Sequence, residues 1–95
     1  MGTSLDTSFL RPADVLAKRG YAKTQLYRDV RAGVMTPGIT KGAKLVVWPA
    51  YEIDAINRAE IAGATRDELR TLVRQLLEQR KTMRRAQFAE SSAAA

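Results

Sequence analysis

The residues best suited to specific chemistry lie between positions 23 and 31. Thr24, Arg28 and Arg31 are spaced i, i+4 and i+7, so in a helix their side chains share one face. Arginine can form two hydrogen bonds with guanine, glutamine can do the same with adenine, and threonine can reach a base edge or a phosphate. The pattern therefore predicts a surface that binds the major groove of double-stranded DNA. Its predicted contact residues are Lys23, Thr24, Gln25, Tyr27, Arg28 and Arg31.

Two further basic groups follow along the chain. The first is the link Lys41-Gly42-Ala43-Lys44, where Lys41, Gly42 and Lys44 are expected to contact DNA from a hairpin tip. The alternative is that these lysines only keep the hairpin soluble. The second group lies near the C-terminus, and we expect it to touch the DNA backbone or else to keep this end solvated. It consists of Arg80, Lys81, Arg84 and Arg85.

The composition favours a polyanionic partner and argues against catalysis. The 95 residues include 16 Lys and Arg against 10 Asp and Glu, which gives a formal charge of +6 and a pI near 10.2. The chain contains no cysteine and no histidine, so the usual thiolate and imidazole ligands and the common near-neutral acid/base are missing. Its carboxylates show no spacing typical of an acid/base pair or a metal site. We therefore expect no enzymatic activity, no metal and no cofactor.

Hydrophobic spacing predicts two short helices before the hairpin. Pro12 suits a first helical turn, and Gly20 stands where a helix of this length would end. A second helix is expected from about residues 22–24 to Ala32, with Leu26 and Val30 facing the core. Strands are then predicted in "MTPGIT" and "KLVVW", on either side of "KGA".

Two more helices are predicted after the hairpin. The segment "PAYEIDAINRAEIAG" has helical spacing, and Gly63 follows its last apolar residue. The final helix opens with Thr65-x-x-Glu68, the pattern of a capping box. Its apolar stripe either folds back on the domain or contacts a second subunit, and its length, about 30 Å for 20 residues, favours the second. The stripe consists of Leu69, Leu72, Val73, Leu76 and Leu77.

This order of elements predicts a mainly α protein with a small β-hairpin. The architecture would be a winged helix-turn-helix followed by a long C-terminal helix. We expect residues 1–8 to be flexible, residues 9–63 to form the winged domain, residues 64–90 to form an amphipathic basic helix, and residues 91–95 to be a disordered tail. Trp48 ends an apolar strand and is expected in the core.

Residues 9–62 resemble the AlpA-like phage and prophage regulators, a winged helix-turn-helix group related to MerR-type domains and to many excisionases. The resemblance is carried by "FLRPADVLAKRGYAKTQLYRDVRAG", by Trp48 and by "EIDA" at residues 52–55. This chain differs from the family just before the recognition helix, where the family commonly has a polar cap residue and this chain has Ala22. The resemblance implies that Lys23, Thr24, Gln25 and Arg28 face bases or phosphates. It also places Lys44 where the basic residue of the wing usually lies.

The resemblance implies one of two roles in a mobile element. One is an excisionase, or recombination directionality factor, that acts with an integrase on attachment-site DNA. The other is a transcriptional regulator that acts with RNA polymerase on a neighbouring gene. Self-association or cooperative binding on adjacent sites would suit either role.

A different class of function is also compatible with the sequence. In it, a protein-interaction adaptor such as a small packaging-type subunit would use the winged domain and the last helix for assembly. Such an adaptor would have no need of Thr24, Gln25 and Arg28 together. No segment reaches the roughly 20 apolar residues that span a bilayer, and the N-terminus lacks the pattern of a signal peptide. We therefore expect a cytoplasmic protein without membrane contact.

Overall fold

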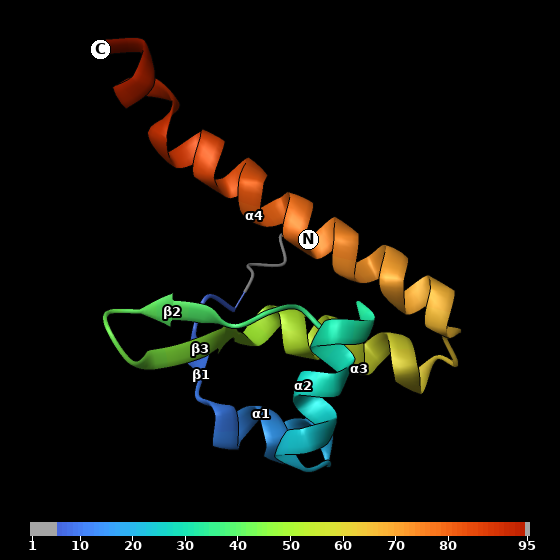
Figure 1. The fold of residues 1–95 in the computed structure, drawn as a ribbon. Helices are drawn as coiled ribbons and strands as arrows, with labels where there is room; N and C mark the ends of the chain where they lie inside the picture. The colour runs from blue at the N-terminus through green and yellow to red at the C-terminus, as the bar shows by residue number, and fades with distance from the viewer. Residues whose placement is uncertain (1–5, 95) are drawn as a thin grey trace.

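The fold comprises four helices and three short strands within residues 6–94 (Figure 1). These are the residues that a computed structural model describes, with side chains described for residues 6–88. The elements are β1 (Phe9–Leu10), α1 (Pro12–Arg19), α2 (Lys23–Ala32), β2 (Ile39–Lys41), β3 (Leu45–Pro49), α3 (Ala50–Ile61) and α4 (Arg66–Ala94). The protein is therefore mainly helical with a small antiparallel sheet.

Glycines end the first two helices, as the sequence predicts. Gly20 has φ +71° and its N–H donates to the carbonyl of Leu16 at 2.8 Å, while Gly33 has φ +80° at the end of α2. A residue with a Cβ adopts this left-handed conformation only with strain, so both positions favour glycine. The start of α2 differs from most helices, because its N-cap is Ala22, which has no side-chain acceptor for the free amides.

The sheet has one strand more than the predicted hairpin. β3 lies in the middle, with β2 on one side and β1 on the other, and all pairs are antiparallel. Phe9 pairs with Pro49 and Leu10 with Trp48. A strand of two residues is too short for hydrophobic alternation to reveal it, so the sequence pattern did not predict β1. Its pairing is extended by the amide of Ala50, which donates to the carbonyl of Ser8 at 2.9 Å.

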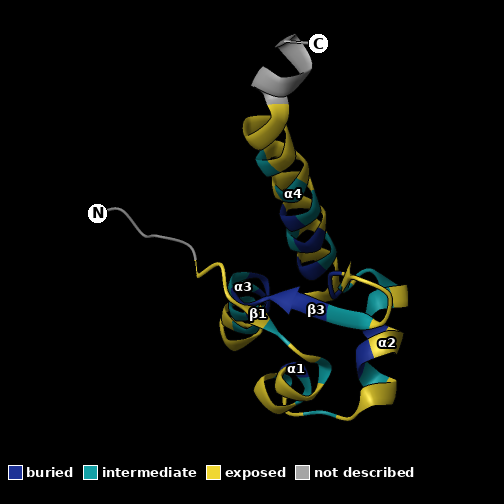
Figure 2. Cartoon of the chain, turned by 90° about the vertical axis from the view of Figure 1, so that its left-hand side faces the viewer, coloured by how far each residue is buried: buried dark blue, intermediate teal, exposed yellow. Residues whose placement is uncertain are grey.

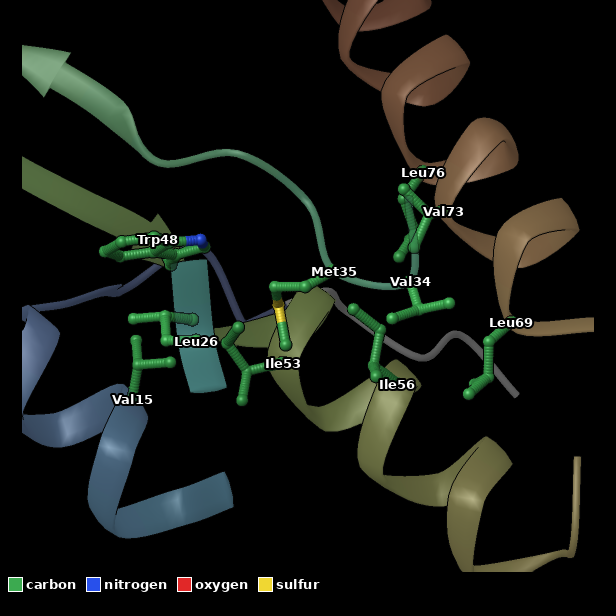
Figure 3. Close-up of a cluster of buried hydrophobic side chains, with 10 residues drawn as sticks. All are labelled: Val15, Leu26, Val34, Met35, Trp48, Ile53, Ile56, Leu69, Val73 and Leu76. Carbon is green, nitrogen blue, oxygen red and sulfur yellow. The ribbon is translucent and has the colours of Figure 1, made fainter. Parts of the chain in front are cut away.

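The core gathers apolar side chains from α1, α2, β3 and α3 around Trp48 (Figure 3). Trp48 is fully buried, which confirms its predicted core position, and its indole Nε1 donates to the carbonyl of Thr36 at 2.8 Å. The backbone at Gly38 passes so close to β3 that an added Cβ would lie 2.5 Å from Cγ1 of Val46 and 3.1 Å from the ring of Trp48. Glycine at this position therefore lets the segment before β2 pack against β3.

The first half of α4 packs against the same core. The predicted capping box forms, because the Thr65 amide donates to Glu68 Oε1 at 2.8 Å and the Glu68 amide donates to Thr65 Oγ1 at 3.1 Å. Leu69, Val73 and Leu76 are buried in the cluster that contains Val34 and Ile56 (Figure 3), whereas Leu72 and Leu77 are partly buried. Of the two alternatives for the stripe, the structure adopts the intramolecular one for Leu69, Val73 and Leu76. The expectation that these three contact a second subunit is wrong, because they complete the monomer core.

The second half of α4 extends beyond the domain (Figures 1 and 2). The helix continues to Ala94, although the sequence predicts a disordered tail over residues 91–95. Alanine has the highest intrinsic helix propensity, so the final alanines favour continuing the helix. At the other end, residues 1–5 of the segment expected to be flexible lie outside the described residues, as does residue 95. Within the described part, Asp6 Oδ1 accepts from the hydroxyl of Ser8 at 2.6 Å.

Candidate nucleic-acid interface

Helix α2 presents most of its predicted contact residues to solvent. Thr24, Arg28 and Arg31 are exposed along one face, and Lys23 and Tyr27 are exposed beside them. Leu26 is fully buried on the opposite face, where it packs into the core with Val15. In the described part of the chain, Lys23, Arg28 and Arg31 form no salt bridge, so their charges are not neutralised by a neighbouring carboxylate.

Gln25 differs from the other predicted contact residues of α2. It is half-buried, and its Nε2 donates to Oδ1 of Asp29 at 2.8 Å. One of its two amide donors is therefore used inside the protein, whereas a bidentate contact with adenine needs one donor and the Oε1 acceptor. Gln25 Oε1 also lies 3.5 Å from Nη1 of Arg28, at the long limit of a hydrogen bond. Gln25 thus lies between the buried carboxylate of Asp29 and the exposed guanidinium of Arg28.

A buried arginine on α1 fixes the position of α2. Arg19 has a side chain only 4% exposed, and its Nη2 lies 3.9 Å from Oδ2 of the buried Asp29. Its Nη1 donates to Asn57 Oδ1 at 2.6 Å and also contacts Glu60, both of α3. Because one guanidinium joins α1, α2 and α3, the orientation of α2 against the other two helices is set by charge as well as by apolar packing.

Tyr21 completes this cluster from the turn between α1 and α2. Its hydroxyl accepts a hydrogen bond from Nε of Arg19 at 3.3 Å, and the guanidinium lies 5.0 Å from the centre of its ring. Burial raises the pKa of Tyr21, and the nearby carboxylates of Asp29 and Glu60 raise it further, while the hydrogen bond and charge of Arg19 oppose them. Burial lowers the pKa of Arg19, but its contacts with Glu60 and Tyr21 outweigh this, so the net shift is upward.

The hairpin provides a second basic surface, although its two lysines differ. Lys44 and Gly42 are exposed in the loop that joins β2 to β3, and Gly42 has φ +68°. Lys41 is also exposed, but its Nζ lies 4.4 Å from the centre of the Phe9 ring, so its ammonium group contacts an aromatic face on β1, the strand on the other side of β3. Of the two lysines, Lys44 has the more open surroundings.

Two views together relate the hairpin to α2. In Figure 2, α2 and the start of β3, where the hairpin loop joins the strand, both lie toward the right-hand side. Figure 1 shows the hairpin loop at the left-hand end of the domain and α2 near its middle, below the sheet. The two elements therefore lie on one side of the molecule and are spaced apart along it.

The predicted basic group of residues 80–85 in the middle of α4 does not act as one surface. Arg80 binds the fully buried Glu52 through Nε at 2.7 Å and through Nη2 at 2.6 Å, and Nη2 also donates to the carbonyl of Pro37 at 2.9 Å. The prediction that Arg80 contacts DNA is therefore corrected, because its guanidinium is bound to Glu52 and to the Pro37 carbonyl. Lys81 and Arg85 are exposed and lie 3.7 and 3.8 Å from the carboxylate of Glu78.

Sequence reasoning missed several residues that position α2. Asp29 is the one acid in α2, and its burial could have been suspected because it interrupts an otherwise basic and neutral helix. Arg70 gave no such signal. Its Nε donates to the carbonyl of Ala32 at 3.2 Å, so α4 holds the C-terminal end of α2. An arginine near a helix C-terminus also interacts favourably with the partial negative charge there.

The described residues offer no alternative inorganic site. Within them, no group of three His, Cys, Asp or Glu side chains is close enough to hold a metal ion. In the same part of the chain, no helix combines the length and apolar character that crossing a membrane requires. The chain matches no protein-family model, no curated protein and no solved structure.

Proposed function

We propose that the protein binds double-stranded DNA in a sequence-specific manner through α2, as a winged helix-turn-helix. One observation carries the proposal: Lys23, Thr24, Tyr27, Arg28 and Arg31 are all exposed on a helix whose opposite side is buried. Arg28 and Arg31 supply donors for guanine edges and phosphates, and Lys23 supplies a phosphate contact near the helix N-terminus. The unpaired amides at that terminus favour a phosphate as well, since the methyl side chain of Ala22 cannot cap them.

The hairpin acts as the wing in this proposal. Lys44 at its tip contacts the backbone beside the groove that α2 enters. The placement of the hairpin and α2 on one side of the molecule supports simultaneous contact with one duplex (Figures 1 and 2). The net charge of +6 adds general attraction to the phosphate backbone.

The biological setting follows from the resemblance to AlpA-like regulators. In this proposal the protein serves a phage or an integrated mobile element, either as an excisionase that directs recombination or as a regulator of transcription. Both roles need the same DNA-binding surface. They differ in which DNA is bound, namely an attachment site with repeated motifs or a promoter.

Footprinting on the DNA that flanks the gene for this protein tests the proposal. The full chain is expected to protect a discrete sequence, and Arg28→Ala is expected to weaken that protection. Arg74→Ala is the matched control, because Arg74 is an exposed arginine that belongs to α4 and not to α2 or the hairpin. Binding that is equally strong on any duplex, or that is unchanged by Arg28→Ala, contradicts the proposal and favours the protein-interaction adaptor.

A further inference from the structure

An apolar groove lies between the sheet and the outer half of α4. Because strand residues alternate between faces, Phe9, Ile39 and Pro49 share one face of the sheet in the observed register. That face and α4 border an open groove with a volume of about 560 Å³, within the range typical of ligand-binding pockets. The described residues that line it are Thr7, Phe9, Ile39, Pro49, Tyr51, Arg80, Met83, Arg84, Gln87 and Phe88.

The groove leaves large apolar side chains in contact with water. Phe9 is 48% exposed and Phe88 is 54% exposed, although phenylalanine side chains are more often buried in a core. Met83 and Tyr51 lie deeper, with the tyrosine hydroxyl 3.5 Å from the methionine sulfur. Exposed aromatic residues beside a flexible methionine are typical of surfaces that bind apolar side chains of a partner.

The charges along the groove are positive. Its charged lining residues, within the part of the chain described, are Arg80 and Arg84, and Arg80 is paired with Glu52. The guanidinium of Arg84 lies 5.4 Å from the centre of the Phe88 ring, and the ammonium of Lys41 lies 4.4 Å from that of Phe9. Each exposed phenylalanine therefore carries a cation beside it, one on the sheet and the other on α4.

We propose that this groove binds an acidic, amphipathic peptide segment of another protein. Leucine or aromatic side chains of the segment insert between Phe9, Met83 and Phe88. Its carboxylates pair with Arg84 and Lys41, which frame the apolar floor. Charge complementarity of this kind selects the partner and speeds the encounter, while the aromatic contacts provide most of the affinity.

The charge pattern argues against other occupants. A second copy of the chain also carries +6, and its own α4 presents Lys81, Arg84 and Arg85 to solvent, so like charges would meet at the groove. The preceding residues of this chain, "MGTSL", contain no carboxylate to pair with the two cations. A nucleic-acid strand requires hydrogen-bond donors on the protein that bind its phosphates. The floor of this groove is instead formed by apolar groups.

The groove is separate from the proposed DNA-binding face of α2. None of the described residues that line it belongs to α2. The protein could therefore hold DNA and an acidic partner at once, which is what recruitment of a second protein to a DNA site requires. Peptide binding to the groove does not depend on DNA, so the two proposals can fail independently.

A displayed library of random 12-residue peptides, selected on the immobilised full chain without DNA, tests the inference. We expect enrichment of sequences that combine several Asp or Glu with Leu, Phe or Trp. The most enriched peptide, synthesised with a fluorophore, is then titrated by fluorescence polarisation. Phe88→Ala and Arg84→Glu are each expected to weaken binding by about tenfold or more, as for central aromatic and charged contacts. Arg74→Glu makes the same charge change on α4 outside the groove and is expected to alter affinity by less than about twofold.

Several outcomes would overturn the inference. Selection of basic or uncharged peptides, no enrichment at all, or equal loss in Arg84→Glu and Arg74→Glu would each exclude an acidic ligand of this groove. Sedimentation that finds a wild-type dimer and a monomeric Phe88→Ala variant would assign the groove to a second copy. Peptide affinity that rises about tenfold when residues 1–5 are deleted would assign it to the chain's own N-terminus. Circular dichroism checks that both groove variants remain folded, which is expected because Phe88 and Arg84 are exposed.

Discussion

Arg80 on α4 holds the buried carboxylate of Glu52 on α3 with two hydrogen bonds of 2.6 and 2.7 Å. The Glu52 side chain is 0% exposed, whereas that of Arg80 is 22% exposed. The pair fastens the middle of α4 to the domain, and the further bond from Arg80 to the Pro37 carbonyl includes the segment before β2. The long helix is therefore attached by ionic contacts beyond the end of its buried apolar stripe.

Replacing Arg80 with methionine is expected to destabilise the protein by about 3–5 kcal/mol, because it leaves a charged carboxylate buried without a partner. Urea unfolding measures this change. The double variant Glu52→Met/Arg80→Met is expected to lose less than Arg80→Met alone, since it removes both charges. Lys81→Met, next to it on an exposed position, is expected to change stability by no more than about 0.5 kcal/mol. Equal loss in the Arg80 and Lys81 variants would show that the buried pair has no special role.

Leu76 and Leu77 are neighbours on α4 but face different surroundings. Leu76 is 6% exposed within the core cluster, whereas Leu77 only packs against it. Leu76→Ala is expected to cost about 2–5 kcal/mol of unfolding free energy, and Leu77→Ala clearly less. Thermal melting of both variants measures the difference. A Leu76→Ala variant that kept its melting temperature and lost only cooperative DNA binding would instead place the stripe between subunits.

The sequence predicted features that depend on neighbours along the chain. Gly20 and Gly33 end helices because a left-handed residue is needed there, and Thr65 and Glu68 cap each other across three residues. The exposure of Arg28 and Arg31 follows in the same way from helical periodicity. Such features need no knowledge of which elements meet.

The features that the sequence did not predict depend on contacts between distant segments. β1 is recognisable only once Phe9 is seen beside Pro49, forty positions later. The sequence alone predicts that Arg80 touches DNA or stays solvated, because only the fold places Glu52 beside it. Asp29, which accepts a hydrogen bond from Gln25, is buried only because α1 packs against α2 and brings Arg19 beside it. The groove belongs to this group too, because β1 and the outer half of α4 form it together.

The raised pKa of Tyr21 predicts that the protein loses stability at alkaline pH. Burial raises its pKa, as does the negative charge of Asp29 and Glu60, so the folded state holds the phenol proton more tightly than the unfolded state. Below the unfolded pKa of about 10 the phenol is protonated in both states and the stabilisation is complete. As pH rises above that value the unfolded state loses its proton first, so the unfolding free energy falls until the pH passes the folded pKa.

Denaturant unfolding between about pH 9 and pH 11 measures this effect. Tyr21→Phe is expected to reduce the downward slope of stability with pH. Burial also raises the pKa of Tyr51, and the nearby Glu52 adds to the increase, so Tyr21→Phe/Tyr51→Phe is expected to reduce the slope further. A slope that is unchanged in the double variant would mean that neither phenol is linked to folding.

Arg28 provides the sharpest test of sequence reading by α2. If its guanidinium binds a base edge, Arg28→Ala is expected to cost about 1–3 kcal/mol on the footprinted site and less on unrelated duplex. Both affinities are measured by gel shift or anisotropy at one salt concentration, with Arg74→Ala as the control. An equal loss on both duplexes would make Arg28 a phosphate contact.

The hairpin offers a matched pair of lysines for testing contact with the backbone. Lys44 is exposed in the loop, whereas the ammonium of Lys41 lies over the Phe9 ring. Lys44→Ala is expected to weaken binding similarly on specific and unrelated DNA and to lower the slope of log K against log salt by about one unit, because one fewer counterion is released. Lys41→Ala is expected to lower that slope less, since its charge is directed to an aromatic ring within the protein. A slope unchanged by Lys44→Ala would remove the hairpin tip from the interface and leave α2 alone to account for DNA binding.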